Sequence, residues 1–270
     1  AQNVWHPRHN PWLITLTVMM AVFMEVLDTS IANIALPHIG GSLSATPEEA
    51  TWVLTSYLVA NAIVLPMTGW LGNYFGRKRV LLSCITMFTI ASVLCGMAWS
   101  LPTLALARIF QGIGGGAMVP IAQSIMLESF PPQKRGVAMA AFAQGVVVAP
   151  ILGPVIGGWI TDSYSWRWIF YINVPVGIFA ALMAKWVVED PPYIKRNLHA
   201  TIDYVGFALL AIWLATMQIV LDKGQEADWF GADWVRWFTF VSVAAFSAFL
   251  WWEFRSDHPL VDLRVFKNKN

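Results

Sequence analysis

Three consecutive cations precede twenty uncharged residues in GRKRVLLSCITMFTIASVLCGMAW, residues 76–99. A helix of about 20 apolar residues spans the hydrocarbon core of a bilayer, and Lys and Arg gather at its cytoplasmic end. Long apolar runs with short polar turns between them recur along the whole chain. Strands of a membrane barrel would alternate apolar and polar residues, and these runs do not. We predict eight transmembrane helices, at about residues 12–36, 51–72, 80–99, 101–126, 136–161, 166–188, 204–221 and 234–252.

The composition agrees with a membrane protein. Hydrophobic residues make up 57% of the chain, charged residues only 12%, and the mean hydropathy is +0.57. A soluble domain needs roughly a quarter of its residues charged to cover its surface. The net charge of +1 gives no indication of nucleic acid as a partner. We therefore predict an all-α integral membrane protein.

The placement of Lys and Arg predicts the orientation of the chain. If the first connection is cytoplasmic, thirteen of the 17 cations fall on the cytoplasmic side and Arg108 falls inside a span. The opposite side holds only Arg167, Lys223 and Arg236. Cytoplasmic loops are enriched in these cations. Both ends of the chain are therefore expected in the cytoplasm.

The sequence predicts neither a metal site nor a bound cofactor. Cys84 and Cys95 are about 16 Å apart along one predicted helix, too far for a disulfide. The sequence has no Gly-Lys-Ser/Thr nucleotide-binding loop, so energy is expected from an ion gradient or another subunit. The five histidines all fall outside the predicted spans, which makes haem or buried metal ligation improbable; they are His6, His9, His38, His199 and His258.

Two acids lie inside the first predicted helix, in FMEVLDTSIAN, residues 23–33. An ionised side chain near the bilayer centre costs roughly 2.5–3.5 kcal/mol on insertion scales. Glu25 and Asp28 are three residues apart and share a helix face, so burial and mutual repulsion both penalise the ionised forms. At least one is expected to take up a proton near neutral pH, as a proton-coupled carrier requires. The alternative is an acid that reaches the headgroups or caps a partner helix.

Arg108 is the lone basic residue buried deep in a predicted span, in LALARIFQGIGGG, residues 104–116. Because arginine stays protonated in proteins, it needs a carboxylate or an aqueous cavity. We predict a switchable pair in which Arg108 competes with a proton for Asp28 or Glu25. A purely structural salt bridge between two helices is the alternative.

Glycine and proline mark two further segments. APILGPVIGG, residues 149–158, puts Pro150, Gly153, Pro154, Gly157 and Gly158 in the fifth span, where they allow kinking and close helix packing. GWLGNYFGRKR, residues 69–79, predicts a tight cytoplasmic reversal followed by cations. Broad drug recognition uses Met-rich and aromatic cavities. Candidate lining residues are Met118, Met126, Met139 and Phe142, with ordinary helix packing as the alternative.

These segments occur in an order that resembles the major facilitator superfamily. The resemblance rests on LDTSIANIALP (27–37), residues 69–79, the Arg108 segment, residues 149–158 and WRWIFYINVP (166–175). More narrowly, TWVLTSYLVANAIVLPMTGWL (51–71) and LDKGQEADWF (221–230) resemble the fourteen-helix drug:proton antiporters of the EmrB/QacA type. The ordered set is specific and covers nearly the whole chain.

The resemblance implies roles for individual residues. It implies a proton-coupling acid at Asp28, with Arg108 as the characteristic arginine of the fourth helix. Its antiporter motif maps onto Gly153, Pro154, Gly157 and Gly158, and its cytoplasmic-loop motif onto Gly69, Gly76, Arg77 and Arg79. The acid common in that loop is Asn73 here, which puts a charge-based latch at this point in doubt.

The resemblance also implies a domain plan and a physiological role. Residues 1–188 would form a six-helix half, 189–203 a cytoplasmic linker, 204–252 two inserted helices, and 253–270 a cytoplasmic segment leading to a second half. The implied function is proton-coupled export of lipophilic drugs by alternating access, across a bacterial cytoplasmic membrane. A periplasmic adaptor and an outer-membrane channel are implied as partners.

Two other functions fit less well. A carrier of the same fold for one metabolite or siderophore differs only in its substrates. A membrane-embedded enzyme or sensor would require a clustered catalytic set or a soluble signalling domain, and the sequence contains neither.

Overall fold

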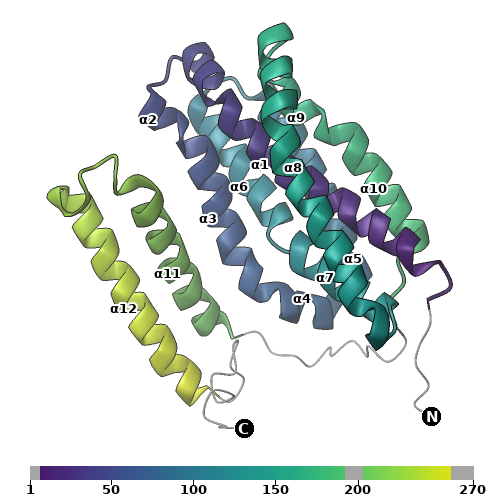
Figure 1. The fold of residues 1–270 in the computed structure, drawn as a ribbon. Helices are drawn as coiled ribbons and strands as arrows, with labels where there is room; N and C mark the ends of the chain where they lie inside the picture. The colour runs from purple at the N-terminus through teal and green to yellow at the C-terminus, as the bar shows by residue number, and fades with distance from the viewer. Residues whose placement is uncertain (1–6, 192–202, 257–270) are drawn as a thin grey trace. The chain divides into compact units, whose positions relative to one another are not determined.

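The computed structural model describes residues 7–191 and 203–256, and helices dominate both ranges (Figure 1). The described residues form two compact units, one on each side of residues 192–202. Eight helical segments in the described ranges are long and apolar enough to cross a membrane. These confirm the eight predicted spans; they are Pro11–Leu43, Pro47–Phe75, Arg77–Met97, Leu101–Ser129, Pro132–Ser163, Trp168–Val187, Tyr204–Lys223 and Asp233–Arg255.

The N-terminal unit contains the first six spans, several of them built from more than one helix. The elements are α1 (Pro11–Leu43), α2 (Pro47–Ala50), α3 (Trp52–Val64), η1 (Leu65–Met67), α4 (Thr68–Phe75), α5 (Arg77–Met97), α6 (Leu101–Gly115), α7 (Met118–Ser129), η2 (Pro132–Lys134), α8 (Arg135–Ser163), α9 (Trp168–Tyr171) and α10 (Asn173–Val187). α1 packs against α7, α8 and α10, while α6 packs against α3 and α5 (Figure 1).

Three predicted spans are interrupted where local chemistry disfavours a continuous helix. The second span passes through the 3₁₀ turn η1, which contains Pro66, a residue without a backbone N–H to donate. The fourth span breaks between Gly115 and Met118, after a run of glycines that stabilise a helix poorly. The sixth span is divided into α9 and α10 at Ile172.

The first helix is longer than predicted. The polar turn predicted between the first two spans, after about residue 36, is wrong over its first part, because α1 continues to Leu43 through Pro37. Ile39 and Gly40 are buried, and a side chain at Gly40 would meet the Ala45 carbonyl at 3.3 Å. Burial of this apolar turn extends the helix, and Ser44 closes it with a left-handed φ of 54°.

The core of the N-terminal unit consists of two apolar clusters. One includes Ile14, Val18 and Met118, and the other includes Ile31, Leu104 and Phe170. Along α1 the boundary between the clusters falls at residues 25–28, where both acids are buried. The fold therefore places a polar layer between two apolar layers.

The C-terminal unit is a hairpin of α11 (Tyr204–Lys223) and α12 (Asp233–Arg255), with η3 (Trp229–Gly231) in its turn. The Trp213 ring packs on Phe246 with ring centroids 4.3 Å apart. Asp203 caps α11 by accepting a hydrogen bond from the Gly206 N–H at 2.9 Å, and it also accepts from the Trp252 indole at 2.8 Å. Most of the predicted linker 189–203 and of the predicted segment 253–270 lies outside the described residues, as do His6, His199 and His258.

Candidate functional site

Asp28 is buried in the polar layer and has a donor on each carboxylate oxygen. Its Oδ2 accepts from the Arg108 Nη1 at 2.5 Å. Its Oδ1 accepts from the Gln111 Nε2 at 3.0 Å and from the Asn173 Nδ2 at 2.6 Å. These donors come from α6 and α10, so one carboxyl group on α1 joins three spans.

Arg108 is fully buried, with 0% of its surface exposed. Its Nη1 donates to the Gln111 Oε1 at 2.7 Å in addition to Asp28, and its Nε donates to the Val53 carbonyl at 3.0 Å. The guanidinium lies 4.4 Å from the Tyr57 ring centroid and 5.6 Å from that of Phe170. If one partner of a buried ion pair is removed, the other charge stays buried without a counter-charge, and the free energy of unfolding falls by about 3–5 kcal/mol. The Nη2 of Arg108 makes no hydrogen bond within the described residues.

Sequence reasoning missed four neutral members of this network. Gln111 donates to the Ser92 Oγ at 2.8 Å, and Asn173 donates to the same oxygen at 3.3 Å. The Cys95 thiol donates to the Gln111 Oε1 at 3.4 Å. Gln111 could have been found from its spacing, because it lies three residues after Arg108 on the same helix face.

The structure separates the two acids of α1. Glu25 accepts hydrogen bonds from the Tyr57 hydroxyl at 3.2 Å and the Asn61 amide at 3.1 Å, both on α3, through Oε1. Its Oε2 is buried without a hydrogen bond in the described ranges, and Glu25 has no ion pair there. Of the two predicted alternatives, the structure pairs Arg108 with Asp28.

The glycines of the predicted antiporter motif differ in what they contact. A side chain at Gly153 would collide with Ser30, and one at Gly157 would meet the Ile31 Cα at 3.3 Å. A side chain at Gly158 would meet nothing within 4 Å. Pro150 and Pro154 lie inside α8, and the Pro150 carbonyl accepts from the Ser30 hydroxyl at 3.3 Å. This motif therefore packs α8 on α1 one turn beyond Asp28.

The cytoplasmic-loop motif, residues 69–79, is helical on both sides of a single glycine. Gly76 alone separates α4 from α5, and its φ of 89° favours glycine. Arg77 forms an ion pair with Glu128 on α7, a partner that the sequence did not indicate. The neighbouring Lys78 Nζ donates to the Lys185 carbonyl at 2.7 Å. The motif therefore fastens the start of α5 to two other helices.

The remaining motif residues lie on the surface. Asn73 and Gly69 are exposed within α4. Arg79 is exposed and has no ion pair among the residues that the structure describes. Asn73 therefore lies within a helix rather than in a turn.

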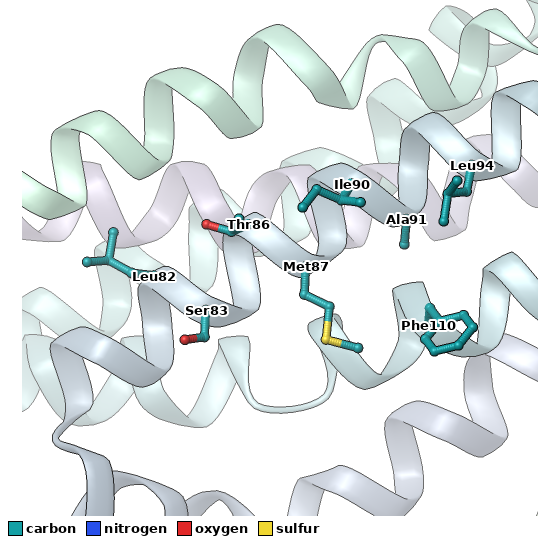
Figure 2. A pocket seen from close by; sticks show the side chains of 8 residues that line it. All are labelled: Leu82, Ser83, Thr86, Met87, Ile90, Ala91, Leu94 and Phe110. Carbon is teal, nitrogen blue, oxygen red and sulfur yellow. The ribbon is translucent and has the colours of Figure 1, made fainter.

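The candidate drug-cavity residues lie in packed protein. Met118, Met126 and Phe142 belong to the first apolar cluster and are almost fully buried, and Met139 packs against it. A groove of about 620 Å³ lies elsewhere, between α5 and α6. Figure 2 shows Met87 and Phe110 on its two sides.

Comparison with known proteins agrees with this architecture. Residues 18–255 match the model of the Major Facilitator Superfamily. The chain is 42% identical to "Multidrug export protein EmrB" of Haemophilus influenzae and 43% identical to the Escherichia coli K12 protein of that name, each over 96% of this chain and 50% of the relative. It is also 42% identical to "Fatty acid resistance protein FarB" of Neisseria gonorrhoeae, over 95% of this chain and 50% of that protein. This chain therefore spans about half the length of these relatives.

Solved structures give the same fold. A partially occluded, inward-open xylose transporter XylE from E. coli superposes with a TM-score of 0.64 at 15% identity, over 90% of this chain and 58% of that chain. The human organic anion transporter MFSD10 superposes with a TM-score of 0.62 at 13% identity, over 90% of this chain and 71% of that chain.

The described residues contain eight membrane-length helices, and the buried ion-pair network lies within the N-terminal unit, so the chain is of the multi-pass membrane class. The chain belongs to the Major Facilitator Superfamily, as the match over residues 18–255 shows. The expected family membership and fold are therefore confirmed.

Proposed function

We propose that this chain is the N-terminal half, with the inserted hairpin, of a drug:proton antiporter of the bacterial cytoplasmic membrane. Relatives with 42–43% identity are named multidrug export proteins. The excess of Lys and Arg on one side supports cytoplasmic ends for this segment. Protons driving the exchange would enter through the buried carboxyl of Asp28.

The observation that carries this proposal is the completely buried Arg108–Asp28 pair. In the ion-paired form, the carboxylate holds α6 and α10 to α1. Protonation removes the negative charge of Asp28 and with it the attraction to Arg108. The guanidinium then retains only neutral acceptors, Gln111 Oε1 and the Val53 carbonyl. The proton and Arg108 thus compete for one carboxyl group.

The α1–α8 contact would transmit this change. Ser30 and Ile31 lie just beyond Asp28 on α1 and face the glycines of α8. Because side chains are absent at Gly153 and Gly157, backbones approach closely and a small shift of α1 must move α8. Alternating access by rocking of one transporter half against the other would use this kind of movement.

The relatives suggest the class of substrate. Their names refer to multiple drugs, to fatty acids and, in an Acinetobacter baumannii protein 33% identical to this chain, to colistin. These compounds share lipophilic or amphipathic character. We therefore propose amphipathic toxic compounds as substrates, with a periplasmic adaptor and an outer-membrane channel as partners.

The test is drug flux in everted membrane vesicles that contain the protein encoded by the complete gene. Ethidium serves as the lipophilic cation, and an imposed proton gradient as the energy source. Asp28→Asn removes the carboxyl group that pairs with Arg108 and is expected to abolish gradient-driven flux, whereas Glu48→Gln changes an exposed acid outside the core and is expected to keep the flux. Unchanged flux in Asp28→Asn rejects the coupling role. Competition by a single polar nutrient, and by no lipophilic compound, would instead favour the metabolite carrier.

A further inference from the structure

A cation lies at one end of an apolar groove along α5. The groove of about 620 Å³ between α5 and α6 shares Ser83 and Met87 with a second hollow of about 440 Å³ between α4, α5 and the α6–α7 break. Because they share these two residues, the hollows lie next to each other along α5, and together they are called the groove below. Arg79 lines the end near α4.

The chemistry of the groove changes along its length. One face of α5 contributes four lining residues at helical spacing: Arg79, Ser83, Met87 and Leu94. Along this face a charged residue is followed by a hydroxyl group and then by apolar side chains. Residues 79–94 cover about 22 Å, which is more than half of the ~30 Å hydrocarbon core. Phe110 faces this stripe from α6 (Figure 2).

Arg79, the cation at the end of the groove, can accept an anionic ligand, whereas the side chains of Arg77 and Lys78 already have partners. Arg77 is paired with Glu128, and the Lys78 Nζ donates to a backbone carbonyl. Arg79 is exposed and has no acidic partner in the described segments of the chain. An anionic group beside Arg79 would therefore gain a charge partner without breaking an existing pair.

We propose that the groove binds an anionic phospholipid, with its phosphate at Arg79 and an acyl chain along Ser83, Met87 and Leu94. A headgroup with net negative charge suits the cation, and a hydrocarbon chain suits the apolar lining beyond it. The position of the groove next to the α6–α7 break would let the lipid stabilise one arrangement of these helices. This proposal does not depend on which compound is exported.

The test is native mass spectrometry of the full-length protein with phosphatidylglycerol, compared with phosphatidylethanolamine as the net-neutral lipid. Arg79→Gln is expected to lower the preference for phosphatidylglycerol about fivefold, the contribution of one cation near an anionic surface. Lys134→Gln is the matched control, because Lys134 is an exposed cation outside the groove. Ser83→Trp fills the junction of the two hollows and is expected to remove one bound lipid.

A phosphatidylglycerol with a photoreactive acyl chain locates the lipid directly. Labelling of α5 and α6 peptides that Ser83→Trp abolishes supports the proposal. Equal effects of Arg79→Gln and Lys134→Gln, or no preference for the anionic lipid, overturn it. Cross-linking of Ser83→Cys to residues 204–255 or to a second copy would also overturn it, because a protein segment would then occupy the groove.

Discussion

At the residue scale, transport and stability should depend on the guanidinium geometry of Arg108 as much as on its charge. Its Nη1 and Nε reach Asp28, Gln111 and the Val53 carbonyl simultaneously. Lysine carries a compact point charge and cannot reproduce this fork. We predict that Arg108→Lys loses most proton-driven transport. It should also lower the unfolding free energy by about 3 kcal/mol, the lower end of the cost of leaving a buried charge without its partner. Thermal unfolding in detergent and vesicle flux measure the two effects.

The control for this substitution is Lys134→Arg, which exchanges the same residue types at an exposed position. It should leave both measurements unchanged. Wild-type flux in Arg108→Lys would show that any buried cation suffices.

Asn173 should contribute to the stability of the same network. Its amide donates to both Asp28 and Ser92. Asn173→Leu keeps the approximate size of the side chain but leaves two buried acceptors with one donor fewer. We predict a loss of about 1–3 kcal/mol in unfolding free energy, the usual cost of an unsatisfied buried polar group. An unfolding free energy equal to that of wild type would contradict this assignment.

At this scale the sequence indicated which charges are costly but left their partners open. Asp28, Glu25 and Arg108 were conspicuous because charge inside an apolar run is rare. The neutral residues Gln111 and Asn173 cost less to bury and gave a weaker signal. Only the tertiary arrangement of α1, α3 and α6 shows that Glu25 faces Tyr57 and Asn61 while Asp28 faces Arg108.

At the element scale, two adjacent glycines in α8 provide a matched pair of substitutions. Gly157 approaches the Ile31 Cα, while Gly158 faces open space. Gly157→Ala is therefore expected to separate α1 from α8, with a loss of about 1–3 kcal/mol typical of overpacking. Gly158→Ala should be neutral or stabilising because alanine favours the helix. Melting temperatures in detergent compare them, and equal melting temperatures would reject close α1–α8 packing.

The connection between α4 and α5 provides a second pair. Gly76 has a φ of 89° and a ψ of 146°, a backbone conformation that glycine adopts readily, and alanine there costs about 1–3 kcal/mol. Gly69 lies in α4, and a Cβ at this position would have no other atom within 4 Å, so Gly69→Ala should be tolerated. We expect Gly76→Ala, and not Gly69→Ala, to lower the melting temperature. The opposite order would contradict the described turn.

The sequence predicted which segments span the membrane, but not where the helices are interrupted or extended. The presence of each span was evident because about 20 apolar residues need no further context to indicate a membrane helix. The interruptions at η1, at Gly115 and at Ile172 were not predicted, since no charged residue marks them in the sequence. The extension of α1 to Leu43 depended on burial of Ile39, which is a tertiary effect.

At the scale of the whole molecule, the α11–α12 hairpin should be separable from the six-helix unit. Each unit is compact on its own, and the hairpin contains an even number of spans. We predict that the full-length protein lacking residues 197–256 still inserts, with the second half in its original orientation. A fluorescent protein fused to the C-terminus should remain on the same side of the membrane. A reversed orientation or complete loss of the protein from the membrane would contradict this prediction.

The central claim, that a proton and Arg108 compete for Asp28, is tested most directly by proton release from the purified full-length protein. Drug is added to weakly buffered detergent solution that contains a pH indicator. We predict proton release by the wild type and by Glu25→Gln, and none by Asp28→Asn, because only Asp28 is paired with Arg108. Undiminished proton release by Asp28→Asn, or its loss in Glu25→Gln alone, would contradict the account.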